Sequence, residues 1–487
     1  MPALSGRKQD AIMKGTRIGG LGVLPLKKQN KIVFFNILST MLLRGISLFT
    51  APVFSRMLGT SGYGVVSIYT VWMGVAAIAC TLQTEGTLVN ARVEYPEEQQ
   101  SKYQSSVMTL SLLFWLACTS IVVVFLPQIS TLLKLHWALV LLLMFHAFGN
   151  FCFNFLNSKF TYEFKADKNM YASVGVTLAT LVLSIVLILA LPEEINYYGR
   201  ILGMALTYGL VGVGICIYVL VKGKTFYNRD YWHLALTLAL PVVFYSLSDI
   251  LLGHCDRVML QQMMSESMVG QYSLAYNFGG IMFTIFAALN NSWTPFFFDD
   301  LKHGRKDALR NQAKNFLEVF TVLSVGFILL TTEVYHVFAS RDFWPGTTLI
   351  PIFVASYYLN FLCTFPVNYE YYHKKTKVVA VVTVFASLVN IGLNYVLIRS
   401  IGMMGAAMAT MISHGLQLLL HYGYVRYVLK KGEYPFGIRV WAKYAIAFCA
   451  VVVVFYLTED MWLLRWGLGA AIGLWELLRV RKRKVLI

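Results

Sequence analysis

Long apolar runs separated by short polar breaks follow one another along the chain from residue 32 to residue 478. Each run has about the length that an α-helix needs to cross a bilayer, roughly 20 residues. The pattern predicts fourteen spanning helices, at residues 32–56, 63–84, 105–127, 135–156, 171–192, 201–221, 233–255, 270–292, 315–332, 346–367, 378–398, 403–425, 440–457 and 461–478. Because no stretch is left for a folded soluble domain, the sequence predicts an all-α polytopic membrane protein.

The first run, residues 32–56, carries Arg44 at its middle. A charge at that depth costs roughly 2.5 to 3.5 kcal/mol on insertion scales, so its surroundings must compensate for it. At about 100° per residue, the polar side chains of this helix share one face. That face holds Asn36, Thr40, Arg44 and Ser47. We therefore expect this helix to line a water-filled cavity inside the bundle.

Three later runs have polar stripes of the same kind. The stripes comprise Ser246, Asp249, Gly253 and Asp256 in the seventh run, Tyr276, Gly280, Thr284 and Asn291 in the eighth, and Thr410, His414, Gln417 and His421 in the twelfth. Pro52 and Pro241 can bend the first and seventh helices, since proline removes a helical hydrogen bond. A purely structural core would not need so many polar positions, so the stripes favour a transport pathway.

The two halves of the chain align with each other at an offset of about 206 residues, which indicates an internal repeat. Gly64 and Ser67 align with Gly270 and Ser273, and further glycines match later in both halves. The repeat is six helices long, so both copies have the same orientation in the membrane. We expect a basic N-terminal tail (1–31), an N-lobe (32–230), a C-lobe (231–432), and two extra helices with a basic tail (433–487).

The net charge of +17 is distributed as in a membrane protein. If the N-terminus is cytoplasmic, the predicted outer loops contain or border one basic residue each: Arg56, Lys134, Arg200, Arg257, Arg341, Arg399 and Arg465. The remaining basic residues, apart from Arg44, fall on the cytoplasmic side. This distribution follows the positive-inside rule, with both termini cytoplasmic and the first span acting as the insertion signal. It argues against binding of nucleic acid.

The sequence contains no constellation that indicates an enzyme or a metal centre. It has no glycine-rich phosphate loop with its lysine, no HExxH and no GxSxG. The 7 cysteines lie singly in predicted spans, and the histidines lack metal-ligand spacing. We therefore expect no catalytic residue and no cofactor. A membrane enzyme such as a polysaccharide polymerase or glycosyltransferase would also need a long outer loop, and the predicted outer loops are short.

Three segments carry a resemblance to a known family. They are PVFSRMLGTSGYG at 52–64, LPVVFYSLSDILLGHCDRVML at 240–260 and IGMMGAAMATMIS at 401–413. Together with the predicted layout of spans and repeat, they make the chain resemble the multidrug/oligosaccharidyl-lipid/polysaccharide exporter superfamily. Within it, the chain looks like the polysaccharide flippases of O-antigen or capsule type.

The resemblance implies a function in the bacterial cytoplasmic (inner) membrane. Members move a lipid-linked sugar, typically on undecaprenyl diphosphate, to the outer leaflet by alternating access, for O-antigen, lipopolysaccharide or capsule assembly. Arg44 would then bind the diphosphate, because a guanidinium offers several fixed donors and keeps its charge. Asn36, Thr40, Ser47, Tyr276 and Asn291 would line the substrate pathway. We expect a monomer, with polysaccharide polymerase or export proteins as possible partners.

The resemblance also implies an ion-coupling site. Lipid II flippases of the superfamily bind sodium with an Asp on helix 7, two polar residues on helix 11 and a Thr on helix 12. Asp249, Asn390, Asn394 and Thr410 hold comparable positions here, with the carbonyl of Ala406 as an extra ligand. Oxygen ligands suit a hard cation. An amide stands at Asn394 where an acid is expected, so the sequence leaves Na⁺ and H⁺ open.

Other readings of these residues stay open at this stage. Arg44 could instead form a structural ion pair with Glu318 or Asp249. Arg56, Asp256 and Arg257 lie near outer helix ends, where they could be solvated or could form a gate between the lobes. A cation-coupled multidrug antiporter would share the fold. Organic cations favour acidic cavities, however, and Arg44 opposes them.

Overall fold

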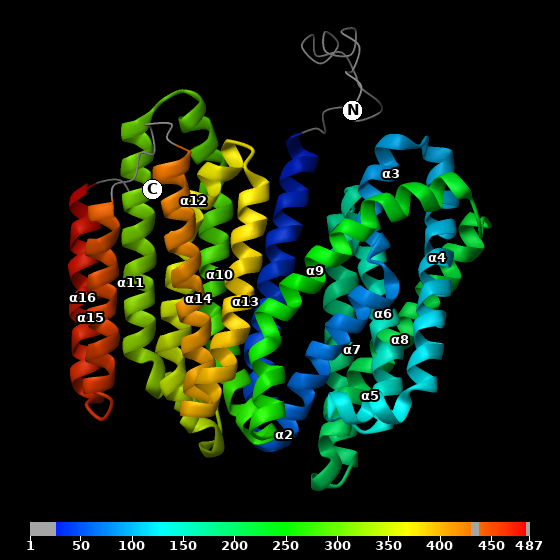
Figure 1. Cartoon of the computed structure of the whole chain (residues 1–487), viewed down its shortest axis with the longest axis horizontal. Coiled ribbons are helices and arrows are strands. Elements are labelled where there is room, and N and C mark those ends of the chain that lie inside the picture. The colour runs from blue at the N-terminus through cyan, green and yellow to red at the C-terminus, as the bar shows by residue number, and fades with distance from the viewer. Residues whose placement is uncertain (1–25, 430–437, 484–487) are drawn as a thin grey trace. The chain divides into compact units, whose positions relative to one another are not determined.

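The computed structural model describes residues 26–429 and 438–483 (Figure 1), and these residues form helices and contain no strand. The α-helices are α2 (Leu26–Thr81), α3 (Leu88–Glu94), α4 (Glu97–Val124), α5 (Leu126–Leu133), α6 (Trp137–Tyr162), α7 (Ala166–Ala190), α8 (Asn196–Gly223), α9 (Arg229–Met263), α10 (Glu266–Lys302), α11 (Lys306–Phe338), α12 (Ile350–Tyr372), α13 (Thr376–Ile401), α14 (Met403–Gly423), α15 (Ile438–Leu457) and α16 (Trp462–Arg483). Short turns connect them: the 3₁₀ segments η1 (Thr84–Thr87), η2 (Glu193–Ile195) and η3 (Arg341–Leu349), and the π segment η4 (Tyr424–Val428).

The predicted apolar runs all fall largely on these helices, which confirms the all-α class of the fold. The first two runs lie on either side of Gly59 within α2, where two helices meet at a kink. Gly59 has φ 64° and ψ −177°, a conformation that glycine adopts without a Cβ clash. In the described part of the chain, 11 helices are long and apolar enough to cross a membrane, with Phe34–Thr81 counted once. The protein therefore spans the membrane many times, and the number of fourteen crossings stays a prediction.

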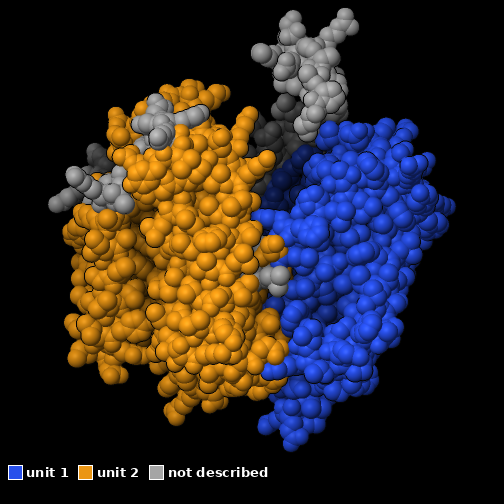
Figure 2. All heavy atoms as spheres, in the orientation of Figure 1, with its two compact units in different colours: residues 1–50, 69–247 blue, residues 51–68, 248–487 orange. Residues whose placement is uncertain are grey.

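The helices form two compact units, coloured separately in Figure 2. Unit 1 contains the described residues up to Thr50 together with Tyr69–Leu247. Unit 2 contains Ala51–Ile68 and the described residues from Ser248 onward. Both α2 and α9 therefore contribute to both units. The lobe boundaries predicted at residues 230 and 432 were drawn from the repeat, and they stay a prediction.

Unit 1 has an aromatic core between α4, α6 and α8. Phe151, Phe155 and Cys152 of α6 are almost completely buried there, next to Tyr103 of α4. The long exposed apolar faces of α7 and α8 are those that a bilayer would cover, because no other described helix packs on them. Unit 1 thus has a packed interior and an apolar exterior.

In unit 2, the hairpin of α15 and α16 packs on α11 and α12. Near the start of α15, Trp441 packs on Phe365, with ring centroids 5.3 Å apart. Further along, Phe448 stacks on Tyr358 at 4.2 Å. These aromatic contacts hold α15 on α12 by offset or parallel ring packing.

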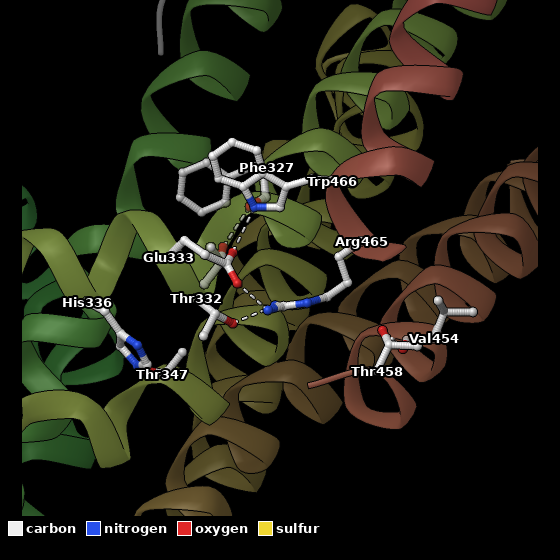
Figure 3. A network of polar contacts seen from close by, with 10 residues as sticks. Phe327, Thr332, Glu333, His336, Thr347, Val454, Thr458, Arg465 and Trp466 are labelled. Carbon is white, nitrogen blue, oxygen red and sulfur yellow. Dashed lines mark hydrogen bonds and ion pairs between the residues drawn. The ribbon is translucent and has the colours of Figure 1, made fainter. Parts of the chain in front are cut away.

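The same hairpin is also attached through a polar network around Arg465 (Figure 3). Arg465, which is 1% exposed, donates to the Glu333 carboxylate and to Thr332 Oγ1, the latter at 2.7 Å. Trp466 Nε1 donates to the other Glu333 oxygen at 3.1 Å. Arg465 lies in the first turn of α16, beside the α15–α16 loop that the sequence predicted it to border, and it is buried against α11. The ion pair explains this burial, because a buried guanidinium requires a partner.

Candidate functional site

The polar face predicted around Arg44 is present on the part of α2 that belongs to unit 1. Asn36, Thr40, Arg44 and Ser47 are all exposed there. Thr40 Oγ1 donates to the Asn36 carbonyl at 2.9 Å, so this hydroxyl is satisfied within its own helix. Within unit 1, the described residues provide no hydrogen bond or ion pair for the Arg44 guanidinium. Arg44 is thus a charged group with free donors on a spanning helix.

The start of α2 is held in unit 1 by contacts with α7. Phe35 meets Tyr171 edge-on, with ring centroids 6.4 Å apart. Lys31 forms an ion pair with Asp167 at 3.4 Å, but both side chains are largely exposed, and such pairs stabilise little. These contacts involve a different face from the one that carries Arg44. They position the helix without using its polar face.

The acids considered as structural partners of Arg44 give no support to that reading. The side chain of Asp249 lies outside the described residues. Glu318 is buried on α11 in unit 2, where it has polar contacts of its own. The functional reading of Arg44 therefore rests on its exposed donors and its place on the polar face.

Asp256 and Arg257 are buried in unit 2, although the sequence placed them at an outer helix end. The Asp256 carboxylate accepts hydrogen bonds from Tyr272 Oη and from the Arg257 amide. The Arg257 side chain is 8% exposed, and its guanidinium lies 4.5 Å from the ring centroid of Tyr276. Its Nε has no hydrogen-bond partner among the described residues. The ring and the charge of the neighbouring Asp256 both act on this buried cation.

Arg56, the third residue considered for a gate, has a different partner. Its Nη2 donates to the carbonyl of Val337 at 2.7 Å, in the last turn of α11. An arginine at this position satisfies one of the free carbonyls at a helix C-terminus. Among the described residues of unit 2, Arg56 thus does not pair with Asp256.

Tyr276 and Asn291 both lie on α10, but the structure does not bring them together. Tyr276 packs on Phe353 and Tyr357 of α12, with ring centroids 5.2 and 6.1 Å apart. Asn291 is exposed. Fifteen residues of helix separate them by about 22 Å. They could contact different parts of a long substrate, but not the same group.

Asn390 and Asn394 of the expected ion site lie together, buried on α13. Asn394 Nδ2 donates to Asn390 Oδ1 at 2.9 Å, and the Cys255 thiol of α9 donates to the same oxygen at 3.3 Å. Asn394 Oδ1 is buried and has no partner among the described residues. Thr410 Oγ1 donates to the Ala406 carbonyl at 3.2 Å. A buried carbonyl oxygen without a donor fits the ligand chemistry of a hard cation.

The described residues contain no cluster of three or more His, Cys, Asp or Glu side chains that could hold a metal ion. A cation at the asparagine pair would be bound by amide oxygens and, in the sequence prediction, by the Asp249 carboxylate. Such a ligand set suits an alkali cation better than a transition metal.

One buried ionisable pair was not found by sequence reasoning. Glu370 of α12 and His421 of α14 are almost completely buried, and His421 Nδ1 lies 3.0 Å from both carboxylate oxygens. Residue spacing places His421 on the polar face of its helix, whereas Glu370 belongs to none of the predicted polar stripes. An acid near the end of a predicted span, with a histidine on a neighbouring polar face, is the signal that could have identified the pair.

Gly64 and Gly270, which align in the repeat, also touch in the structure. A Cβ at Gly64 would overlap the Glu266 carbonyl, and a Cβ at Gly270 would overlap the Thr60 carbonyl. The hydrogen bonds are reciprocal as well. Ser267 bonds to Thr60 at 2.8 Å, and Ser61 bonds to Glu266 at 3.4 Å.

The reciprocity has a simple geometric meaning. Thr60 and Glu266 are 206 residues apart, as are Ser61 and Ser267, and this is the offset of the sequence repeat. Two helices related by a two-fold axis would make this set of contacts. Small residues at the crossing allow the backbones to approach closely, as in other membrane helix pairs.

The fold defines the class of protein: a multi-span helical membrane protein with the fold of known lipid flippases and multidrug transporters. The structure is similar to the lipid II flippase MurJ in an inward closed conformation, with a TM-score of 0.69 and 18% identity over 93% of this chain and 100% of that one. It is also similar to an inward-facing MATE multidrug resistance transporter, with a TM-score of 0.58 and 14% identity over 81% of this chain and 96% of that one. At these identities the likeness concerns the fold.

The family follows from the sequence comparison. The model of the family described as "Polysaccharide biosynthesis protein" matches residues 30–299, more than half of the chain. The chain belongs to this family, as the resemblance predicted. Two relatives in Haemophilus influenzae are an uncharacterized membrane protein (23% identical, covering 70% of this chain and 83% of the relative) and Lsg locus putative protein 1 (24% identical, covering 69% and 83%).

Proposed function

We propose that the protein is a flippase that moves an undecaprenyl-diphosphate-linked oligosaccharide from the inner to the outer leaflet of the bacterial cytoplasmic membrane. The glycan would serve polysaccharide export, such as O-antigen or lipopolysaccharide assembly. Membership of the polysaccharide biosynthesis family and the flippase fold support the general function. The observation that supports this cargo is the state of Arg44, an exposed guanidinium with free donors on the polar face of a spanning helix.

The chemistry of Arg44 suits a diphosphate. Guanidinium groups bind phosphate oxygens through two parallel hydrogen bonds and stay charged when water is removed. Asn36, Thr40 and Ser47, on the same face, add neutral polar groups for sugar hydroxyls or phosphate oxygens. Binding of the headgroup there would neutralise Arg44 and thereby offset the cost of the charge within the membrane.

The test is complementation of a strain that lacks the protein. We expect Arg44→Ala, inserted at normal levels, to lower surface polysaccharide at least about tenfold, since loss of a charge-assisted contact of 1.5 to 3 kcal/mol corresponds to a factor of roughly 10 to 100. Arg44→Lys should recover part of the activity, because it keeps the charge and loses the fork geometry. Lys31→Ala, which removes an exposed cation from the same helix, is the matched control and should be active.

Full activity of Arg44→Ala would remove Arg44 from cargo binding and reject the proposal in this form. The MATE-like fold then makes the second candidate, a cation-coupled multidrug antiporter, the next function to test. Drug resistance of the same strains distinguishes the two. A flippase restores polysaccharide without changing resistance, whereas an antiporter changes resistance without restoring polysaccharide.

For energy coupling, we propose a Na⁺ or H⁺ site formed by Asp249, Asn390, Asn394 and Thr410. The unpartnered Asn394 Oδ1 supports a cation there. If Na⁺ binds, replacing K⁺ by Na⁺ at constant ionic strength should raise the melting temperature of the purified protein, because a ligand stabilises the state that binds it. Asn394→Leu should abolish this shift. A shift that persists in Asn394→Leu would place the ion elsewhere, and no shift in the wild type would favour H⁺.

The remaining expectations concern topology and assembly. We propose that both termini are cytoplasmic, on the distribution of basic residues, and that the protein works as a monomer by transport alone, with no enzymatic step of its own. Polymerase or export proteins would take the glycan on the outer side. Labelling of single cysteines placed in the predicted outer loops, with a reagent that does not cross the membrane, tests the orientation.

A further inference from the structure

Helices α6 and α8 of unit 1 touch at glycines. A Cβ at Gly149 would overlap the Tyr208 carbonyl, and a Cβ at Gly212 would lie 2.5 Å from the Cα of Gly149. The two backbones are therefore in direct contact, as in small-residue crossings of membrane helices. Figure 1 shows both helices side by side in this unit.

This contact sets two lysines at the same depth. Lys159 follows Gly149 by ten residues on α6, and Lys222 follows Gly212 by ten residues on α8. Both residues also contact Tyr218 of α8, so the two helices run in the same direction. Ten residues correspond to about 15 Å along a helix. The lysines therefore lie side by side, at the end that the basic residues assign to the cytoplasm.

Both ammonium groups lie close to the ring of Tyr218. The Lys159 Nζ is 5.4 Å from the ring centroid of Tyr218, and the Lys222 Nζ is 5.7 Å from the same centroid and 3.4 Å from the hydroxyl. Lys159 is only 5% exposed, and among the described residues no acid forms an ion pair with its ammonium group. Partial burial of an ammonium group without an anion is costly, and the ring offsets only part of that cost.

The local charges leave an excess of positive charge at this place. Glu163 is the acid that acts on Lys159, but its carboxylate is bound by Lys165 at 2.5 Å. Lys222 and Lys165 both repel Lys159. An anion beside Tyr218 would relieve this repulsion. Lysine is a frequent ligand of phosphate, as a point charge without a fixed fork geometry.

The surroundings identify the source of the anion as a lipid. On α8, Ile217 is 57% exposed and Val221 63%, on the apolar surface that adjoins Tyr218. In a membrane this surface contacts acyl chains. A phosphate bound by the two lysines would thus lie beside an apolar surface. The acyl chains of a lipid would contact that surface, whereas free inorganic phosphate would not. Anionic headgroups attract basic residues at the cytoplasmic surface, with about 1 kcal/mol for each Lys.

We propose that Lys159, Lys222 and Tyr218 bind the headgroup phosphate of an anionic phospholipid, such as phosphatidylglycerol, in the inner leaflet. This site is formed by α6 and α8 of unit 1 and does not involve Arg44. It is therefore independent of the cargo, and it goes beyond the proposed flippase function.

The experiment uses the full-length purified protein in nanodiscs of phosphatidylcholine with or without phosphatidylglycerol. We expect phosphatidylglycerol to raise the melting temperature and to be retained in native mass spectra. Lys222→Gln, at an exposed position that should fold normally, should weaken retention roughly 5-fold, the factor that corresponds to the loss of about 1 kcal/mol. Lys159→Gln should weaken it at least as much. Lys168→Gln, an exposed lysine on α7, is the matched control.

Three outcomes would overturn the proposal. Equal retention of phosphatidylglycerol by the wild type and Lys222→Gln would show that the lysine pair is not the site. Equal stabilisation by inorganic phosphate in phosphatidylcholine discs would show a free-anion site instead of a lipid site. If Lys159→Gln fails to fold, Tyr218→Leu replaces it, and unchanged retention in that variant would also contradict the proposal.

Discussion

Gly64 and Gly270 meet so closely that a Cβ on either one would overlap a backbone carbonyl of the opposite helix. Each glycine amide lies 3.1 Å from the position that a Cβ of the other would take. Valine at either position must push the helices apart. If transport alternates between two states, we expect this contact to form in one of them and to open in the other.

A cysteine pair tests whether these helices must separate. Thr60 Oγ1 and Ser267 Oγ are 2.8 Å apart, so sulfur atoms at the same positions are close enough for a disulfide after a small adjustment. We expect Thr60→Cys/Ser267→Cys to cross-link under oxidation and to lose transport, measured as surface polysaccharide in the deletion strain. Reduction should restore transport.

Each single cysteine variant is the control and should stay active under oxidation. Gly64→Val should also lose most activity, whereas Gly214→Ala, where a Cβ meets no atom within 4 Å, should keep it. Normal transport by a fully cross-linked protein would mean that the two helices stay together throughout the cycle.

The Arg465 network predicts a measurable loss of stability. Arg465→Met leaves the Glu333 carboxylate, whose side chain is 25% exposed, without its main counter-charge. Because water reaches this carboxylate, the cost is below the about 3 to 5 kcal/mol of breaking a fully buried pair. We expect a clear fall in the melting temperature of the purified protein. Arg465→Met/Glu333→Leu should be more stable than Arg465→Met, because no unpaired charge remains.

Arg341→Ala serves as the comparison, since Arg341 is exposed and lies near the same end of α11. It should change the melting temperature little. If the double variant were no more stable than Arg465→Met, the network would stabilise the hairpin by packing and not by its charges.

Glu85 makes stability depend on pH. This residue lies in η1, between the spanning part of α2 and α4, and its Oε2 is buried without a hydrogen-bond partner among the described residues. Burial raises the pKa of Glu85 from 4.5 to about 7. Between these values the folded state keeps a proton that the unfolded state has lost, so stability falls as pH rises from about 4.5 to 7.

We therefore expect Glu85→Gln to have a higher melting temperature than the wild type at pH 8, and a similar one at pH 4.5. Thermal unfolding at several pH values in one detergent measures both. Glu98→Gln, at an exposed position of α4, should follow the wild type. A parallel pH profile for Glu85→Gln and the wild type would contradict the assignment.

The helices could be predicted from the sequence because spanning segments are long and apolar, a property of each segment alone. The polar face around Arg44 could also be predicted, because residue spacing alone decides which side chains share a helix face. The structure leaves that face exposed in unit 1. The break between the first two spans was expected, and the structure confines it to a kink at the single residue Gly59, where two helices meet.

Side-chain partners could not be predicted in this way. Asp256 and Arg257 looked interfacial from their place in a span, but Tyr272 and Tyr276 of the next helix enclose them. The Glu370–His421 pair and the Arg465 network join residues 51 and 132 positions apart. Such pairs depend on which helices pack together, and hydrophobic periodicity carries no information on that.

The composition of unit 2 also has a consequence for biogenesis. Its first segment, Ala51–Ile68, is synthesised early, and the rest of the unit begins at Ser248, 180 residues later. At about 5 to 20 residues per second, the ribosome needs roughly 10 to 40 s to make the intervening chain. During that time the residues around Gly64 are in the membrane, but α10, the helix that packs against them, has not yet been made. The uncovered glycine backbone can contact lipids or other nascent helices. We therefore expect incorrect helix pairing to be most frequent during this interval.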